Sequence, residues 1–320
     1  MLVAHPPFHP STPSPLMRSL GIFAAPFKPQ ACELAARLVQ LSEARGLRLR
    51  VEESCARTIN RADLAGSHDE IARCEAVVVL GGDGGVLSAA RAAAPYGTPI
   101  LAVDLGRLGF LSTVRPEDLD QAFGQLLCDG FEVEDRTMLE AQVLREGAPI
   151  VTAKPTAGLD APSGERIIGL NDAVVAKSAL ARILELSIYV EGELVADVRA
   201  DGLVISTPTG STAYALSAGG PITTPDAPIF LICPICAHSL TQRPLVVGSH
   251  ETIEVLAQWQ GEEVSTEAIE AMLTVDGQIG VQLRSGDRVR VRRAPIVTRL
   301  LRAPGDSFYA RLREKMRWGH

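Results

Sequence analysis

The chain has 320 residues, of which 46% are hydrophobic, and this length and composition allow two domains with buried cores. Its formal net charge of −7 argues against a nucleic-acid-binding protein, in which a basic face is usual. No apolar run approaches the roughly 18 residues that a membrane-spanning helix needs. We therefore expect a cytoplasmic protein.

The first residues do not resemble a signal peptide. MLVAHPPFHPSTPSPLM lacks a basic start and has prolines where a signal peptide needs an uninterrupted apolar stretch. We expect residues 1–17 to be a disordered leader, or residues upstream of the true start.

Strands and helices alternate in the first half of the chain. Apolar, β-branched runs predict strands, and apolar residues at helical spacing predict helices between them. The expected strands are 19–26, 48–54, 75–80 and 98–105, and the expected helices are 30–46, 84–95 and 116–130. Continuous apolar strands separated by helices indicate a parallel sheet that is covered on both faces.

From residue 131 onward, polar and apolar residues alternate in short segments with few helices. The segments 183–190 and 194–200, joined by Glu-Gly-Glu, indicate a hairpin, and 243–248, 250–258 and 287–297 continue the pattern. This pattern predicts a mostly antiparallel β domain. Two stretches, 154–165 and 259–270, are expected to be exposed loops. A final helical stretch, FYARLREKMRW, could return to the first domain.

The expected organisation is therefore α/β plus mostly β. A leader at 1–17 precedes an N-terminal parallel α/β domain at 18–134. A β-rich domain at 135–297 is followed by a C-terminal segment at 298–320 that packs on the N-terminal domain.

The cysteines do not indicate a metal or redox site. Only Cys233 and Cys236 form a CxxC, and no second pair of ligands stands at similar spacing. The pair follows a strand-like segment and contains Pro234, whereas a thioredoxin-type pair opens a helix. We expect reduced, packed thiols.

A glycine cluster stands where the strand 75–80 ends and a helix begins. The sequence EAVVVLGGDGGVLSAA places Asp83 between two pairs of glycines. Such a junction exposes backbone N–H groups to phosphate oxygens. A Walker loop is excluded because the chain has no Gly-Lys, and a dinucleotide fingerprint starting at Gly82 is excluded because position 87 is Leu87.

Two roles are open for Asp83. It could be a helix N-cap, since aspartate satisfies free amide donors at a helix start. It could also accept a proton from an attacking hydroxyl, as the catalytic aspartate of kinases does, with the glycines leaving room for a charged substrate.

A second motif, RADGLVISTPTGSTAYALSAGGPI at 199–222, is dense in hydroxyls and small residues. A capped helix with exposed hydroxyls explains only some of them. The hydrolase pattern GxSxG is absent, because Ala215 stands two residues before Ser217. A polar cradle for a sugar and a base fits this motif better.

These motifs, in this order, resemble the signature series of the NAD kinases. The series consists of GGDG, NDAVV with the following Arg182, ADGLVISTPTGSTAYALSAGGPI, PICAHSL and DGQ, and the similarity runs from about residue 19 to the end. GGDG also occurs in lipid kinases and phosphofructokinases, whereas the second motif is highly specific.

The resemblance implies a usually oligomeric enzyme, a homodimer or homotetramer, that phosphorylates the 2′-hydroxyl on the adenosine ribose of NAD. The donor would be ATP with a divalent metal ion such as Mg, or inorganic polyphosphate. No protein residue is assigned to the metal, and no nucleic acid or membrane partner is expected. By this resemblance Asp83 is the proton acceptor, and the phosphate-donor loop is Gly81, Gly82 and Gly85. The residues implied in NAD binding are Gly84, Asn171, Asp172, Arg182, Arg199, Asp201, Thr212, Ala213, Tyr214, Ala215, Leu216, Ser217 and Gln278, and some of them could serve a neighbouring subunit.

Each of these residues has a simpler interpretation when it is considered alone. Asn171 and Asp172 could form an Asx-type turn, and Arg182 and Arg199 could be solvated charges. The Asp-Gly before Gln278 could be a hairpin turn. Their joint occurrence in family order favours the functional interpretation.

Three positions depart from the family pattern, and one of them, Asp172 in place of the more frequent glutamate, is an accepted variant. The family loop usually reads GGDGT or GGDGS, but here position 85 is glycine, and Asp104 stands where asparagine is usual. They motivate one alternative, a non-catalytic sensor that binds NAD, while the GGDG loop alone motivates another, a lipid kinase. The sequence does not decide between ATP and polyphosphate, between NAD and NADH, or whether NADP(H) regulates the protein.

Overall fold

The computed structural model describes residues 17–25, 28–106, 109–145, 166–178, 183–239, 241–259 and 270–316. The predicted leader lies outside these ranges except for Met17. The loop predicted at 154–165 and Arg182 also lie outside them, as does the loop predicted at 259–270 apart from its two end residues.

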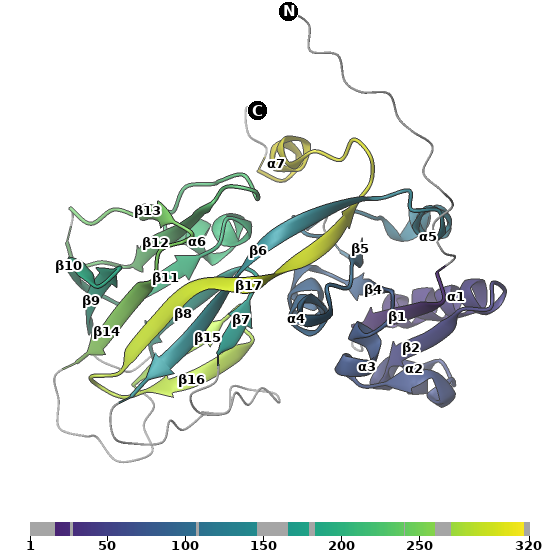
Figure 1. Cartoon of the computed structure of the whole chain (residues 1–320), viewed down its shortest axis with the longest axis horizontal. Coiled ribbons are helices and arrows are strands. Elements are labelled where there is room, and N and C mark those ends of the chain that lie inside the picture. The colour runs from purple at the N-terminus through teal and green to yellow at the C-terminus, as the bar shows by residue number, and fades with distance from the viewer. Residues whose placement is uncertain are drawn as a thin grey trace, which may run out of the picture.

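The N-terminal half contains the predicted parallel sheet, with helices on both faces (Figure 1). The strand order is β5-β4-β1-β2-β3 and each of these pairings is parallel. The strands are β1 (Ser19–Ala24), β2 (Arg48–Glu52), β3 (Ala65–Gly66), β4 (Ala76–Gly81) and β5 (Ile100–Asp104). The helices are α1 (Pro29–Glu43), α2 (Glu53–Thr58), α3 (His68–Ala72), α4 (Asp83–Ala93) and α5 (Leu119–Leu127), with 3-10 turns η1 (Ala62–Leu64), η2 (Ala94–Tyr96) and η3 (Pro116–Asp118).

The continuous apolar strands are buried on both faces, as their composition predicts. All six residues of β4 are buried. On one face, α1 and α5 pack with Leu38 and Phe123 against the sheet. On the other face, α3 and α4 pack with Ile71 and Leu87. The covered sheet leaves the carboxyl ends of β4 and β5 as the place where loops can build a site.

The short helices α2 and α3 were not predicted. They have six and five residues, too few for a helical period to be visible in the sequence. A local signal did exist for α3, because Ser67 and Glu70 form a capping box. The Ser67 Oγ accepts from the Glu70 N–H at 3.2 Å, and the Glu70 carboxylate accepts from the Ser67 N–H at 2.9 Å.

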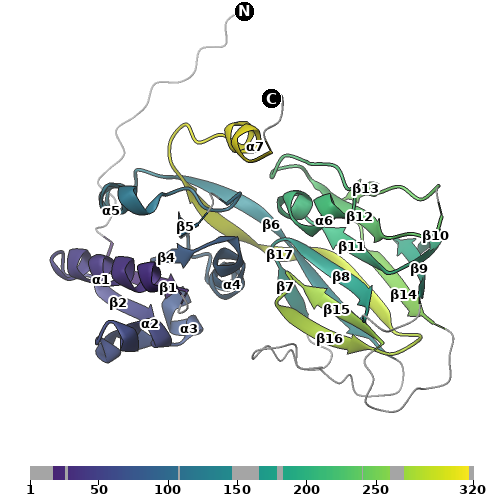
Figure 2. The same cartoon turned by 180° about the vertical axis from the view of Figure 1, so that it is seen from behind.

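The C-terminal half is a β-sandwich, which confirms the predicted antiparallel β domain (Figure 2). One sheet has the order β13-β12-β11-β8-β15-β16, and all its pairings are antiparallel. Its strands are β8 (Asp172–Lys177), β11 (Gly202–Ser206), β12 (Ile229–Ile235), β13 (Leu245–Gly248), β15 (Ala271–Val275) and β16 (Ile279–Leu283). The facing strands are β6 (Glu132–Leu144), β7 (Ile167–Gly169), β9 (Leu184–Val190), β10 (Glu193–Ala200), β14 (Ile253–Gln258) and β17 (Arg288–Arg302).

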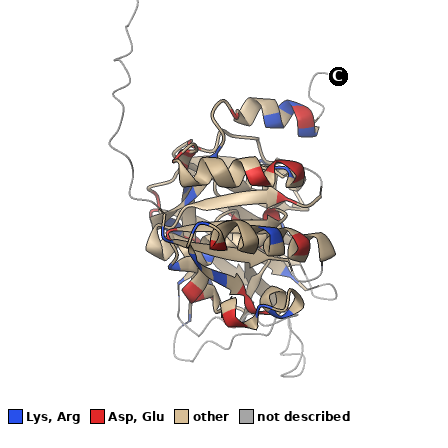
Figure 3. Cartoon of the chain, turned by 90° about the vertical axis from the view of Figure 1, so that its right-hand side faces the viewer, with Lys and Arg blue, Asp and Glu red and all other residues tan. Residues whose placement is uncertain are grey.

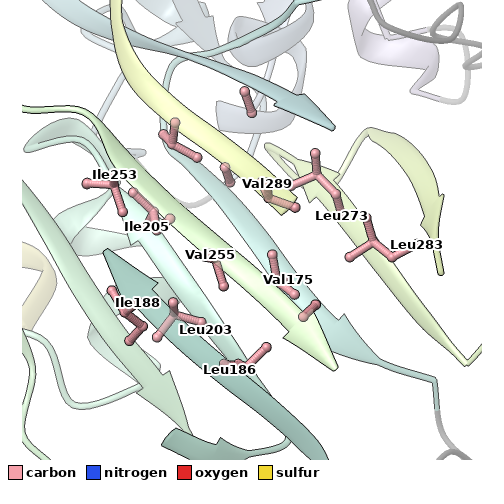
Figure 4. Packing of buried hydrophobic residues seen from close by; sticks show 14 of the residues in the cluster. Val175, Leu186, Ile188, Leu203, Ile205, Ile253, Val255, Leu273, Leu283 and Val289 are labelled. Carbon is pink, nitrogen blue, oxygen red and sulfur yellow. The ribbon is translucent and has the colours of Figure 1, made fainter. Parts of the chain in front are cut away.

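Alternating residues of both sheets form the core between them. Figure 4 shows Val175 and Leu203 of one sheet packed with Ile188 and Val255 of the other. The inward-facing positions of β9 and β14 alternate with more exposed ones, which is the period-two pattern seen in the sequence.

Two long strands join the halves. β6 and β17 have 13 and 15 residues and pair antiparallel along most of their length. β17 also pairs with β5 in parallel at Leu300 and Ile100, so one 11-stranded sheet continues through both halves. The predicted boundaries at 134/135 and 297/298 fall inside these strands, and the division into domains stays a prediction.

The expected hairpin turn at 191–193 is present, and so is the one that the Asp-Gly before Gln278 offered as a simpler interpretation. Glu191 and Gly192 have φ values of 50° and 81°, and Asp276 and Gly277 have 53° and 63°. Positive φ at two successive residues is the geometry of a type I′ turn, which glycine and aspartate tolerate best.

The C-terminal helix α7 (Phe308–Met316) returns to the first half, as predicted. The Phe308 ring lies 6.5 Å from the Phe110 ring, and the Lys315 ammonium lies 4.4 Å from the centre of the same ring. Glu314 is 3.8 Å from Arg115. The helix therefore packs on the loop that follows β5.

The cysteine prediction is correct for one member of the CxxC. Cys233 is buried in β12, and burial raises the pKa of its thiol to about 11. Cys236 is a free thiol too, but it is exposed, at a positive φ of 48°, and is therefore not packed as expected. Among the described residues, no group of three or more His, Cys, Asp or Glu is placed to hold a metal ion.

Acidic and basic residues are interspersed on the face shown in Figure 3. Within the described part of the chain, no helix is both long enough and apolar enough to cross a bilayer.

Candidate active site

Asp83 is not a helix cap. The N-cap of α4 is Gly82, and Asp83 is the first residue of the helix. Its carboxylate accepts hydrogen bonds from a different segment, from the Phe110 N–H at 3.0 Å and the Leu111 N–H at 3.3 Å. The capping interpretation is therefore wrong. The two amides orient the carboxylate, and because a carboxylate has about four lone-pair sites, it keeps the capacity to accept a further proton or hydrogen bond.

Gly109 is required by this arrangement. A Cβ atom at position 109 would lie 1.8 Å from the Asp83 Oδ1. The Asp83 carboxylate therefore lies directly against the backbone of the loop after β5. The loop is fixed from its other side by Asp104, whose carboxylate accepts from the Gly106 N–H at 3.0 Å and the Gly109 N–H at 2.6 Å.

The glycines around Asp83 have no such explanation inside the chain. A Cβ on Gly82 would meet nothing within 4 Å, and a Cβ on Gly84 would meet only the Gln278 Nε2 at 3.9 Å. Neither residue has a positive φ. The fold therefore tolerates side chains at both positions. Space beside the N-terminus of α4 is left open, and this is what a phosphate-bearing ligand requires.

Gln278 brings the β-sandwich to this glycine loop. Its Nε2 donates to the Gly84 carbonyl oxygen at 2.7 Å, and its Oε1 accepts from Arg91 of α4. Gln278 follows the Asp-Gly turn between β15 and β16. The turn is therefore both a hairpin connection and a contact between the two halves at Asp83.

Asp276 of the same turn is a site residue that sequence reasoning missed. Its carboxylate accepts from the backbone N–H groups of Leu170, Asn171 and Asp172 at 3.0, 2.7 and 3.3 Å. It also forms a salt bridge of 3.1 Å with Arg91, and its own side chain is fully buried. No local pattern in the sequence signals this role, because the partners of Asp276 lie more than 100 positions away.

Asp172 is held next to this carboxylate. It begins β8 and is buried, and burial together with the nearby Asp276 raises the pKa of its carboxyl to about 7. Burial likewise raises the pKa of Asp276, although the three amides and Arg91 oppose this. Near neutral pH, the Asp172 carboxyl can therefore donate or accept a hydrogen bond at the start of β8.

The raised pKa of Asp172 makes stability depend on pH. The folded pKa of about 7 exceeds the ordinary value of 3.8, so the native state binds more protons between these values and stability falls as pH rises from about 4 to 7. We expect Asp172→Asn to be more stable than the wild type at pH 8.5, by up to roughly 4 kcal/mol, with a smaller gain at pH 5. Thermal unfolding of the ligand-free protein at both pH values measures this. The exposed Asp226→Asn is the control, and an equal gain for Asp172→Asn at both pH values would contradict the assignment.

The second motif is folded against Asn171 by its own hydroxyls. Thr207 donates through Oγ1 to the Leu170 carbonyl oxygen at 2.6 Å, and the Thr207 N–H donates to the Asn171 carbonyl oxygen at 2.8 Å. A Cβ on Gly210 would lie 2.3 Å from that same Asn171 oxygen. Some of the hydroxyl groups that the sequence suggested for ligand binding, such as that of Thr207, therefore hold the fold of the motif instead.

The rest of the motif contains exposed groups. The 3-10 turn η4 (Thr209–Thr212) leads into α6 (Tyr214–Ser217). Tyr214 and Ser217 are exposed, whereas Ala215 is fully buried against β8, β11 and β12. Thr212, Ala213 and Leu216 are partly buried. The available polar surface of the predicted cradle is thus concentrated at Thr212, Tyr214 and Ser217.

Models of one protein family match both halves of the chain. The ATP-NAD kinase N-terminal domain matches residues 20–131, and the ATP-NAD kinase C-terminal domain matches residues 170–303. The chain belongs to the ATP-NAD kinase family.

Named relatives of the family match nearly the whole chain. The chain is 39% identical over 304 residues to the NAD kinase of Moorella thermoacetica, covering 95% of this chain and 90% of the relative. It is also 39% identical over 306 residues to the NAD kinase of Citrifermentans bemidjiense, covering 95% and 99%.

Solved structures of NAD kinases share the fold. Yeast NADH kinase, solved in complex with NADH, aligns with a TM-score of 0.80 and 24% identity over 95% of this chain and 89% of that chain. An NAD kinase from Archaeoglobus fulgidus, solved in complex with ATP, aligns with a TM-score of 0.69 and 21% identity over 94% and 99%.

The departures from the NAD kinase pattern at Gly85 and Asp104 are accommodated locally. The Asp104 carboxylate is buried and accepts two backbone N–H groups, so it anchors its own loop. A Cβ on Gly85 would lie 3.4 Å from Val79, an ordinary contact, and position 85 is exposed. The glycine is therefore not required by the fold.

Arg199 and Asp201 lie away from Asp83 within one chain. They precede β11, whereas Asp172 pairs with Ser206 at the opposite end of that strand. Arg199 is exposed and lies 3.7 Å from Glu185, and Asp201 forms a salt bridge of 3.1 Å with Lys177. The structure thus brings together Asp83, Gly84, Asn171, Asp172 and Gln278 but not these two residues.

Proposed function

We propose that this chain transfers the γ-phosphoryl group of ATP to the 2′-hydroxyl on the adenosine ribose of NAD, with Asp83 as the proton acceptor. The observation that carries the proposal is the open glycine loop around a carboxylate that two remote amides orient. Membership of the ATP-NAD kinase family supports the choice of substrates.

The proposed step is an in-line displacement. As the bond between the ribose 2′-oxygen and the γ-phosphorus forms, the bond from that phosphorus to the β,γ-bridging oxygen breaks and ADP leaves. The 2′-hydroxyl proton passes to the Asp83 carboxylate. The N-terminal amides of α4 and the backbone of Gly81, Gly82 and Gly85 would face the transferred phosphoryl oxygens.

A divalent cation would neutralise charge on the β- and γ-phosphate oxygens when it is bound. Asp83 is engaged by two backbone amides, and no group of three or more acidic, His or Cys side chains gathers in the described part of the chain. These residues fit a cation that arrives with ATP and is held mainly by its phosphates.

The dinucleotide would lie between α4 and the second motif. We propose that Asn171 and Asp172 bind ribose hydroxyls and base, that Gly84 lies against the substrate and that Gln278 closes the site. The segment from Thr212 to Ser217 would contact the rest of the dinucleotide. Asp172 is suited to this role because its pKa of about 7 lets it accept or donate near neutral pH.

Arg182, Arg199 and Asp201 are proposed to act in an oligomer, a homodimer or homotetramer. Arg199 lies on β10, an edge strand on which Leu194 and Val195 are about half exposed. An apolar edge strand is a candidate for pairing with a second copy. Light scattering with size-exclusion chromatography measures the assembly. The cytoplasmic location expected from the sequence stays a prediction.

The direct test is NADP formation. Purified protein is incubated with NAD, Mg²⁺ and either ATP or polyphosphate, and NADP is measured with an NADP-specific dehydrogenase. We expect NADP with at least one donor. NAD binding by calorimetry without NADP from either donor would favour the sensor, and phosphorylation of a diacylglycerol by labelled ATP would favour the lipid kinase.

The open space at Gly82 gives a separate prediction. A Cβ atom at position 82 would meet nothing within 4 Å, so Gly82→Val should lower the free energy of unfolding by only about 1 kcal/mol, the cost of losing a glycine N-cap. The same side chain would occupy the proposed phosphate space, and we expect the KM for the donor to rise about tenfold or more. Steady-state kinetics with varied ATP and thermal unfolding measure both. Gly124→Val, in equally open space on α5, is the control; an unchanged donor KM in Gly82→Val would contradict this placement of the donor.

A further inference from the structure

Arg302, the last residue of β17, holds the loop that orients Asp83. Its Nη1 donates to the Leu111 carbonyl oxygen at 3.1 Å and its Nη2 to the Phe110 carbonyl oxygen at 3.4 Å. The N–H groups of these same two residues donate to the Asp83 carboxylate. The Arg302 side chain thus binds the carbonyl oxygens of Phe110 and Leu111, and the N–H groups of these two residues bind the Asp83 carboxylate.

The Arg302 side chain is itself fixed. It is buried, and its Nε donates to the Glu134 Oε2 at 2.7 Å. The same oxygen accepts from the Arg136 Nη2 at 2.8 Å, and the Arg136 Nη1 donates to the Thr209 Oγ1 of the second motif at 3.3 Å. A continuous chain of hydrogen bonds therefore runs from the second motif to Asp83.

The charges in this network favour its ionised form. Burial opposes ionisation of Glu134, but the neighbouring Arg136 and Arg302 outweigh it and lower the pKa of this carboxyl below its ordinary value. Hydrogen bonds between ionised groups are about twice as strong as neutral ones and hold their geometry more firmly. Arg302 is therefore anchored well enough to fix another segment.

The helix α7 holds the same loop from outside. Phe308 and Lys315 both contact the Phe110 ring. Arg311 of α7 is bonded to Asp306 at 2.7 Å. Burial and the nearby Arg302 lower the pKa of its guanidinium, and the negative charges of Asp306, Glu134 and Asp83 oppose this. The C-terminal segment thus lies within electrostatic range of the proposed base.

We propose that Arg302 is a positioning residue for the phosphoryl-transfer step, acting through the backbone of Phe110 and Leu111 on the Asp83 carboxylate. The inference rests on the proposed function. It assigns a role to the β17–α7 end of the chain, where no residue is proposed to bind either substrate. A displacement of about 1 Å in a reacting group can cost about 100-fold in rate.

The test is Arg302→Lys. Lysine keeps the positive charge beside Glu134, but its single ammonium lacks the planar fork that spans Glu134 and two carbonyl oxygens. We expect kcat to fall about 10- to 100-fold while the KM for NAD changes less than about threefold. Arg299→Lys is the matched control, because Arg299 lies on the same strand, is half exposed and donates to the Gly97 carbonyl oxygen.

A double-mutant cycle separates positioning from a general structural role. If Arg302 acts through Asp83, Arg302→Lys should change the residual kcat of Asp83→Asn by less than about twofold. An equal loss in both backgrounds, or a kcat near the wild-type value in folded Arg302→Lys, would overturn the proposal. A wild-type protein that forms no NADP would instead count against the proposed function.

A second variant covers the case in which Arg302→Lys does not fold. Phe308→Leu weakens the hold of α7 on the Phe110 ring without burying a charge. We expect a smaller fall in kcat, about three- to tenfold, again with an unchanged KM for NAD and no further loss in the Asp83→Asn background. Tyr309→Leu, an exposed neighbour on α7, is its control, and equal kcat in both variants and the wild type would overturn the proposal.

Discussion

Asp83→Asn is expected to lower kcat for NADP formation about 10²- to 10⁴-fold and to leave the Kd for NAD within about threefold of the wild type. Asparagine keeps the size of the side chain and one acceptor oxygen, but its amide cannot take the proton from the 2′-hydroxyl. The side chain contacts the amides of Phe110 and Leu111 rather than the residues proposed to bind NAD. Coupled dehydrogenase kinetics measure kcat, and calorimetry measures the Kd.

This substitution also disturbs a loop, so a matched control is needed. Asp104→Asn removes one of two equivalent acceptors for the Gly106 and Gly109 amides in the same loop, without touching the proposed base. We expect its kcat to fall less than tenfold. Similar losses in the two variants would show that loop anchoring, and not proton acceptance, explains the effect at position 83.

Asp276→Ala is expected to lower the free energy of unfolding by about 3–5 kcal/mol. The substitution removes the 3.1 Å salt bridge of Arg91, and this loss is costly because the Arg91 side chain is only 13% exposed. It also removes the acceptor of three backbone N–H groups at Leu170, Asn171 and Asp172, and buried donors without partners are costly. Urea unfolding followed by circular dichroism measures the change.

Two further variants show which part of Asp276 matters. Asp276→Asn keeps an acceptor for the amides and tolerates the positive φ of 53°, so we expect a smaller loss than for alanine. The exposed Asp226→Ala should change stability by less than about 0.5 kcal/mol. A loss below about 1 kcal/mol in Asp276→Ala would mean that the network does not join the two halves energetically.

The glycine loop around Asp83 lies at a junction that local sequence patterns predict. The apolar run before Gly81 and the helical period after Gly85 placed the glycines at a strand-to-helix junction, and β4 and α4 confirm this. The alternative that Asp83 caps its own helix could not be dismissed from the sequence. It was settled by Phe110 and Leu111, which lie 27 and 28 residues further along.

The Asp-Gly turn shows the same division. Its hairpin was evident from the residue types, because few residues other than glycine, asparagine and aspartate tolerate successive positive φ values. Its contacts with Leu170–Asp172 and Arg91 were not evident, since they join residues more than 100 positions apart. The hydroxyls of the second motif predict ligand groups, but the Thr207 hydroxyl donates to the Leu170 carbonyl oxygen and is structural.

The amino-acid sequence alone determined the longer helices and strands, the parallel and antiparallel halves, the residue types of the two hairpin turns and the position of Asp83 at a strand-to-helix glycine loop. These features depend on the spacing of apolar residues and on the residue types in turns, and both can be seen within a short stretch of sequence. Tertiary structure decided that the amides of Phe110 and Leu111 orient Asp83 and that the Asp276 carboxylate binds the amides of Asn171 and Asp172. It also decided that β17 and α7 contact the loop after β5. These depend on the registers of strands that are distant in sequence, and no local pattern records a register of that kind.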